Sequence, residues 1–176
     1  MDRTAAIAAL LHERGAAGVP HPGGTPAAHL ERVQQRLTDL GAGEDVALAG
    51  RAHAVYGTDG FDVVLVHGAD RHLVAAAVGA PAERLVHRYG GCARRATWGG
   101  LATTRTVHDR WTGTAEVLRD ADLRAFADLS LVNELDVAAH DPGVLDRHGD
   151  LLRRLARDWE PVLSPAVAAE ARRVLG

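Results

Sequence analysis

The chain has 176 residues, which is enough for one ordinary domain with its own hydrophobic core. Its net charge is −3 and its arginines are scattered, so it lacks the clustered basic face of nucleic-acid-binding proteins, and its apolar runs are too short to cross a bilayer. These properties predict a cytoplasmic protein that binds neither nucleic acid nor membrane.

Two absences narrow the chemistry further. Cys92 is the only cysteine, which excludes an intrachain disulfide and a zinc site built on cysteines. The sequence has no lysine, which excludes ordinary pyridoxal-phosphate catalysis and a lysine-dependent phosphate loop. By contrast, there are 10 histidines, and these are the side chains on which catalysis or metal binding would depend.

Abundant alanine, leucine and arginine favour helices, and apolar residues recur at helical spacing along most of the chain. Thr25 is a good N-cap, Pro26 is a good first helical residue, and Gly41 is a natural end for the helix between them. In chain order, the predicted helices cover residues 4–14, 26–40, 44–56, 71–78 and 81–89, then 120 or 122 to about 140, about 142–159, and a last helix that is capped by Ser164 and ends at Leu175.

One segment differs from the rest. Strand-like residues at 103–107 and 113–118 flank a polar turn, and they predict a small β-hairpin that could act as a lid or flap. Trp98 and Trp111 flank this segment. They either close over a ligand or simply pack, and the sequence leaves both interpretations open.

Two histidines are the strongest candidates for a site. His53 lies on the predicted core face of helix 44–56, and His29 lies beside the apolar stripe of helix 26–40. Consecutive helices joined by a short loop pack as antiparallel neighbours, so the two imidazoles can meet in one interior pocket. An acidic residue from a third helix would complete a metal site of two histidines and one carboxylate, and Asp136 is the candidate.

Other residues could contribute, and each also has a structural interpretation. A lone histidine on an apolar face is more often a core residue than a ligand, and Asp136 could instead be a solvated surface charge. His21 is a ligand, a substrate contact or a turn residue, while Tyr56 is a proton donor or a packing residue. Asn133 lies on a predicted apolar stripe and needs a partner if buried, either backbone or substrate. Thr58 is a further candidate for orienting substrate.

Three front segments carry a resemblance to a known family. They are Pro20-His21-Pro22-Gly23-Gly24-Thr25, then His29-Leu30, then Leu48 through Thr58 with the pattern Leu-Ala-Gly-x-x-His-x-x-Tyr-Gly-Thr. They resemble an uncharacterised bacterial domain family related to the HD-like helical proteins. Asn133 and Asp136 resemble an Asn-x-x-acid pair of the same family, and the resemblance spans roughly residues 15–140.

The resemblance implies a helical fold with a divalent-metal site. Most characterised HD-like proteins hydrolyse phosphate esters, and a minority are di-iron oxygenases of small molecules. His29, His53 and Asp136 match three of their metal-binding places. The chain departs from the family's His-Asp doublet, because Ala54 follows His53. The missing carboxylate favours a mononuclear or a metal-free site.

The expected fold is therefore an all-α, HD-like helical domain with a small β-hairpin near residues 103–118. A single domain is expected over residues 1–176, with its core at 15–140 and a C-terminal helical extension at 141–176.

The leading functional hypothesis is a hydrolase that uses one divalent metal, either iron, manganese or zinc, on a small-molecule substrate. His29, His53 and Asp136 would bind the metal, His21 or Tyr56 would transfer protons, and Thr58 or Asn133 would orient the substrate. One alternative is a non-haem iron oxygenase of small-molecule biosynthesis. Another is a metal-free acid–base isomerase or cyclase, or a protein that only binds a ligand. The substrate and the oligomeric state, including a homodimer, stay open.

Overall fold

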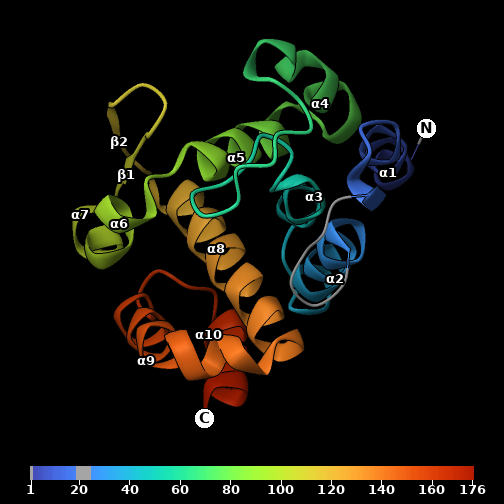
Figure 1. Cartoon of the computed structure of the whole chain (residues 1–176). Helices are drawn as coiled ribbons and strands as arrows, with labels where there is room; N and C mark the ends of the chain where they lie inside the picture. Colours follow the sequence, from blue (N-terminus) through green and yellow to red (C-terminus); the bar gives the residue numbers. More distant parts are fainter. Residues whose placement is uncertain (1, 19–24) are drawn as a thin grey trace. The chain divides into compact units, whose positions relative to one another are not determined.

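The computed structural model describes residues 2–18 and 25–176. The described residues are mostly helical and contain a small antiparallel sheet of two strands (Figure 1). The prediction of an all-α fold with a small β-hairpin is therefore confirmed. No helix in these two ranges is both long and apolar enough to cross a membrane.

The chain divides into two compact units, Met1–Gly91 and Cys92–Gly176. The predicted core, residues 15–140, spans parts of both units, and the C-terminal helices belong to the second. That the whole chain forms one domain stays a prediction.

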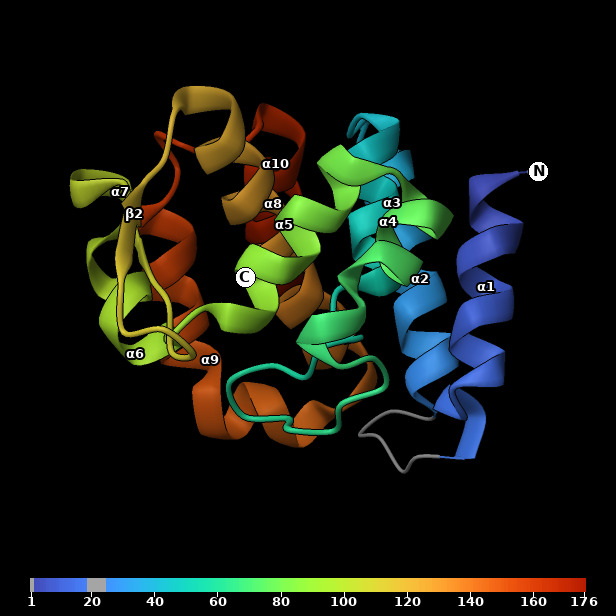
Figure 2. The same cartoon turned by 90° about the horizontal axis from the view of Figure 1, so that it is seen from above.

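The first unit is a succession of short and medium helices. Their bounds agree with the predicted helices to within two residues, except at the end of the third. The elements are α1 (Arg3–Glu13), η1 (Ala16–Gly18), α2 (Pro26–Asp39), α3 (Glu44–Ala52), η2 (Gly68–Asp70), α4 (Arg71–Val78) and α5 (Ala80–Gly91) (Figures 1 and 2).

Helices α2 and α3 form an antiparallel pair. α2 begins where predicted, because Thr25 Oγ1 accepts a hydrogen bond from Ala28 N at 3.2 Å. In the turn that follows α2, Gly41 has a φ of 78°, a left-handed conformation that favours glycine. The helices then approach closely at Gly50, where an added Cβ would lie 2.6 Å from Leu37 Cδ1. This pairing places the start of α2 beside the end of α3.

Helix α3 ends at Ala52, so the prediction that it continues to Tyr56 is wrong. The chain turns at this point, and Val55 N donates to Ala52 O at 2.9 Å in place of the helical bond. Gly57 then takes a φ of 74°, a left-handed conformation that stops any further helical turn. His53 is consequently the C-cap of α3 and not a residue inside the helix.

The second unit contains the hairpin and the three longest C-terminal helices. The predicted hairpin is present, with Val107 of one strand opposite Glu116 of the other. The elements are α6 (Arg94–Thr97), η3 (Trp98–Gly100), α7 (Leu101–Thr104), β1 (Thr106–His108), β2 (Ala115–Val117), α8 (Asp120–His140), α9 (Pro142–Asp158) and α10 (Pro165–Leu175) (Figure 1).

Polar caps position the last two helices. The Asp141 carboxylate accepts from Gly143 N at 3.0 Å at the start of α9, and a proline follows each cap. At the start of α10, Ser164 Oγ accepts from Val167 N at 3.4 Å. The buried Asp128 of α8 accepts from Ser164 N at 2.9 Å, so the first turn of α10 is tied to α8.

The two tryptophans near the hairpin have different surroundings. Trp98 packs edge to face on the buried Trp159, with ring centres 5.8 Å apart. The Trp98 carbonyl also accepts from Trp159 Nε1 at 3.0 Å. Trp111, in contrast, is 42% exposed beside Arg110. Trp98 is therefore a packing residue of the second unit, whereas Trp111 is a surface residue of the hairpin turn.

Candidate functional site

His29 and His53 meet inside the first unit. Both residues are only 3% exposed, their ring centres lie 5.3 Å apart, and their planes cross at 86°. His29 lies in the first turn of α2 and His53 caps the end of α3, so the antiparallel pairing of these helices brings the rings together. The two imidazoles form one buried cluster.

The backbone fixes the tautomer of His53. Its Nδ1 lies 2.8 Å from Gly50 O. Because a carbonyl oxygen can only accept, Nδ1 carries the hydrogen and donates it, and the lone pair of the neutral ring is then on Nε2. Histidines that bind a metal through Nε2 are commonly oriented by such a bond from the other nitrogen. His53 is thus oriented to act as a ligand or as a base.

Tyr89 of α5 also packs against His53. Its ring centre lies 5.3 Å from that of His53, the planes cross at 87°, and Tyr89 is itself buried. Edge-to-face contacts of this kind restrain the plane of an aromatic ring. Tyr89 is not among the residues predicted from the sequence, where its only signal is its position on the apolar face of the predicted helix 81–89.

Tyr56, three residues after His53, is hydrogen-bonded to a charged cluster. Its hydroxyl donates to Glu83 Oε1 at 2.9 Å. Arg71 donates to both oxygens of the same carboxylate, from Nε to Oε1 at 2.7 Å and from Nη2 to Oε2 at 2.8 Å. Glu83 is buried, and these hydrogen bonds provide the partners that a buried carboxylate requires.

The protonation states of this cluster follow from its contacts. Burial alone would raise the pKa of Glu83, but the hydrogen bonds from Arg71 and Tyr56 outweigh it and lower that pKa. Burial and the bond to Glu83 raise the pKa of Tyr56 well above its usual range. At neutral pH, Glu83 is a carboxylate and Tyr56 is a neutral phenol that donates to it. The Tyr56 hydroxyl thereby anchors the turn after His53, and its part in proton transfer stays a prediction.

Glu83 and Arg71 are also missing from the sequence predictions. A glutamate in a predicted amphipathic helix looks like a surface charge, and nothing in the spacing connects it with an arginine twelve positions earlier. His87 of α5 also lies against Tyr56, with ring centres 5.7 Å apart.

Thr58 lies in a tight turn that follows Tyr56 in the chain. Its backbone exchanges hydrogen bonds with Phe61, at 2.8 and 2.9 Å. A small apolar cavity of about 10 Å³ beside this turn is lined in part by Leu30 and Ala54, which directly follow the two histidines in sequence. Such a volume corresponds to about one water molecule, so a substrate requires a wider opening. The contact of Thr58 with substrate stays a prediction.

Asn133 and Asp136 lie on α8, in the second unit. Both are buried, which overturns the interpretation of Asp136 as a solvated surface charge. Asn133 Nδ2 donates to Glu134 Oε1 at 2.9 Å, and Arg94 donates to the same oxygen at 3.0 Å. The partner that a buried Asn133 was expected to need is therefore a neighbouring side chain. His140 lies beside Asp136, and its Nδ1 is 3.4 Å from the Asp136 carboxylate.

The ring-centre separation of the histidine pair is compatible with two ligands of a divalent ion, and it is also that of an ordinary edge-to-face contact such as the one between His53 and Tyr89. With a metal–nitrogen bond of about 2.1 Å, two imidazoles on a tetrahedral ion have ring centres about 5.2 Å apart. The observed separation is 5.3 Å. Within residues 2–18 and 25–176, however, no group of three or more His, Cys, Asp or Glu side chains is arranged to hold a metal. Asp136 as the third ligand stays a prediction, and His21 lies outside the described residues.

The comparisons with known proteins point to the same unit. A family described as a domain of unknown function (DUF6817) matches residues 10–94, and this part of the chain is similar to that family. No curated protein and no solved structure matches the chain. The matched residues include His29, His53 and the Tyr56–Glu83–Arg71 cluster, whereas Asn133 and Asp136 follow the match. All but the last three of the matched residues lie in the first unit, together with the buried histidine cluster.

Proposed function

We propose that this protein is a cytoplasmic, metal-dependent enzyme that acts on a small molecule, and that His29 and His53 bind one divalent ion. One observation carries the proposal. His53 donates through Nδ1 to Gly50 O, which leaves Nε2 as the ligand nitrogen, and its ring lies at a distance from His29 that suits a shared metal. Imidazole ligands suit iron and zinc, and a carboxylate such as that of Asp136 would suit manganese.

The residues of the chain would each have a limited task. Gly50 O holds the tautomer of His53, Tyr89 restrains its ring, and burial of the cluster excludes bulk water. Tyr56, held by Glu83, fixes the turn that carries His53. A preorganised ligand of this kind binds with little rearrangement. When bound, the metal would supply Lewis acidity and lower the pKa of a coordinated water.

Hydrolysis is the favoured reaction, because the HD-like proteins that the front segments resemble are mostly phosphohydrolases. A metal-loaded preparation that cleaves phosphate monoesters or diesters, and loses this activity in His53→Ala, would support it. Oxygen consumption by the iron(II)-loaded protein in the presence of a small-molecule library would support an oxygenase instead.

Metal analysis of protein freed of any histidine tag tests the proposal. We expect about one divalent ion per chain by mass spectrometry of the elements, and loss of at least tenfold in cobalt(II) affinity in His29→Ala and in His53→Ala. His12→Ala and His72→Ala are matched controls, because both are exposed histidines of the same unit. Asp136→Asn in the same assay tests the predicted third ligand.

Two results would count against the metal proposal, provided that circular dichroism shows each variant to be folded. Wild-type protein that binds no manganese, iron or zinc would overturn the proposal. So would alanine variants of His29 and His53 that bind cobalt(II) as tightly as the two control variants do.

A metal-free acid–base enzyme is the second candidate. It is favoured by the absence, among the described residues, of any group of three metal-ligating side chains. In this case Nε2 of His53 would take up a proton from the substrate directly. Added manganese, iron or zinc would then raise neither the melting temperature nor the activity, while His53→Ala would still abolish turnover.

A further inference from the structure

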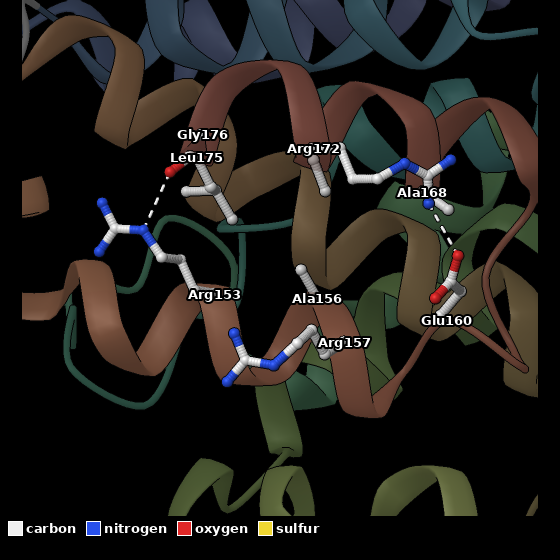
Figure 3. A pocket seen from close by; sticks show the side chains of 9 residues that line it. Arg153, Ala156, Arg157, Glu160, Ala168, Arg172, Leu175 and Gly176 are labelled. Atoms are coloured by element: carbon white, nitrogen blue, oxygen red, sulfur yellow. Dashed lines mark hydrogen bonds and ion pairs between the residues drawn. The ribbon is translucent and has the colours of Figure 1, made fainter.

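A groove on the second unit, between α9 and α10, has the properties of a binding site. Its volume is about 200 Å³, and its walls come from facing sides of the two helices (Figure 3). Three alanines, Ala156, Ala168 and Ala171, form its apolar floor, because their small side chains leave the space between the helices unfilled. The groove thus lies between two regular helices.

Arginines surround this floor, and two of them are ion-paired, Arg153 with Asp150 at 3.3 Å and Arg172 with Glu160 at 2.7 Å. At one end of the groove, Arg153 Nε donates to Leu175 O at 2.9 Å (Figure 3). At the other end, Arg172 Nη1 donates to Glu160 Oε1 at 2.7 Å (Figure 3). These contacts close the two ends of the groove and hold α9 against α10.

Arg157 is the exception. It lines the groove between the two bridged ends (Figure 3), and its guanidinium makes no hydrogen bond or ion pair with the described part of the chain. Because Arg153 pairs with Asp150 and Arg172 with Glu160, Arg157 is the arginine of the lining whose charge has no partner among the described residues. An unmatched guanidinium beside an apolar floor is suited to a ligand with an anionic group and a hydrocarbon part.

We propose that this groove binds a small organic anion, a carboxylate attached to a short hydrocarbon chain. The guanidinium of Arg157 binds the carboxylate, since its fork of N–H donors matches two carboxylate oxygens. The hydrocarbon part lies on the alanine floor. The volume of about 200 Å³ is below the roughly 300 Å³ at which pockets for drug-sized ligands begin, so the ligand is small. This proposal does not depend on the histidine cluster of the first unit.

Titration of the ¹⁵N-labelled full chain with sodium octanoate, followed by NMR, tests this. We expect saturable shifts in the amides of α9 and α10, with affinity reduced at least fivefold in Arg157→Gln. Arg154→Gln is the matched control, because it removes the same charge from an exposed residue of the same helix that does not line the groove. Ala156→Leu, which fills the floor, is also expected to weaken binding.

Two further probes separate the alternatives. Inorganic phosphate should bind more weakly than octanoate, because it leaves the floor empty, and neutral 1-octanol should bind more weakly because it leaves Arg157 unmatched. Equal binding of octanoate to Arg157→Gln and to wild type, equal binding of 1-octanol, or no saturable shift up to about 10 mM would overturn the proposal. His53→Ala should bind octanoate as wild type does, so this result is independent of the metal assay.

Discussion

Replacing Glu83 tests whether the charged cluster stabilises the turn that carries His53. Glu83→Gln keeps the shape of the side chain and an oxygen for the Tyr56 hydroxyl, but it removes the charge and sets an amide against Arg71. Breaking a buried ion pair costs about 3–5 kcal/mol. The Arg71 side chain is 40% exposed, so water can solvate it after the change and reduce this cost. We expect the free energy of unfolding to fall by about 2 kcal/mol at neutral pH.

The pH dependence of this loss has a definite sign. The folded-state pKa of Glu83 is lowered, so its stabilising contribution is fully present above the ordinary glutamate pKa of about 4.3. The contribution disappears as the pH falls through the lowered folded value, because the carboxyl group is then protonated in both states. The difference in stability between wild type and Glu83→Gln should therefore be largest at neutral pH and shrink below about pH 4.

The chain offers a convenient probe and a matched control for this measurement. Both tyrosines, Tyr56 and Tyr89, belong to the first unit and all three tryptophans to the second, so urea unfolding followed by tyrosine absorbance reports on the first unit. Glu13→Gln removes the same charge from an exposed residue of α1 in the same unit, and it should change the free energy of unfolding by less than about 0.5 kcal/mol. Equal losses in the two variants, or a loss in Glu83→Gln that is constant with pH, would refute the reasoning.

Three other substitutions probe the fold around both units. Gly50→Ala places a Cβ against α2 and should destabilise the first unit by about 1–3 kcal/mol, whereas Gly68→Ala, with open space around it, should not destabilise it; urea unfolding checks both. Burial raises the pKa of Asp128, so the folded protein loses stability as the pH rises and this carboxyl group becomes charged. Asp128→Asn keeps an acceptor for Ser164 N but carries no charge. It should therefore raise the melting temperature more at pH 7 than at pH 3. In a spectrophotometric titration of the wild type, the tyrosinate signal of Tyr56 should appear well above pH 10. The same signal should be absent from Tyr56→Phe.

The helices and their ends were largely predictable because short-range signals determine them. Thr25, Asp141 and Ser164 each precede a proline, and each caps a helix where this pattern predicts one. The meeting of His29 and His53 followed from one further step, since two helices joined by a short loop pack side by side. Local patterns were therefore enough to bring together the first two residues of the candidate site.

The remainder of the site depends on contacts that local patterns do not encode. Apolar spacing continued the third helix to Tyr56, but the hydrogen bond from Tyr56 to Glu83 and the turn at Gly57 draw this segment towards α5 instead. Glu83 and Arg71 carry opposite charges in different helices. The sequence around them would look the same if both side chains were solvated on the surface. Only the folded chain distinguishes a buried ion pair from two such charges.

The composition of the buried cluster is itself an argument for function. Two imidazoles and a phenol lie against one another in the interior, where hydrocarbon side chains would pack without polar atoms that need partners. Replacing buried polar groups by well-packed apolar ones is often neutral or stabilising, so stability alone gives no reason for histidines at positions 29 and 53. Sites where a sequence departs from the most stable choice are commonly the working sites of a protein. The nearby Tyr56–Glu83–Arg71 cluster fits this interpretation, because it fixes the position of the turn after His53 more firmly than packing alone would.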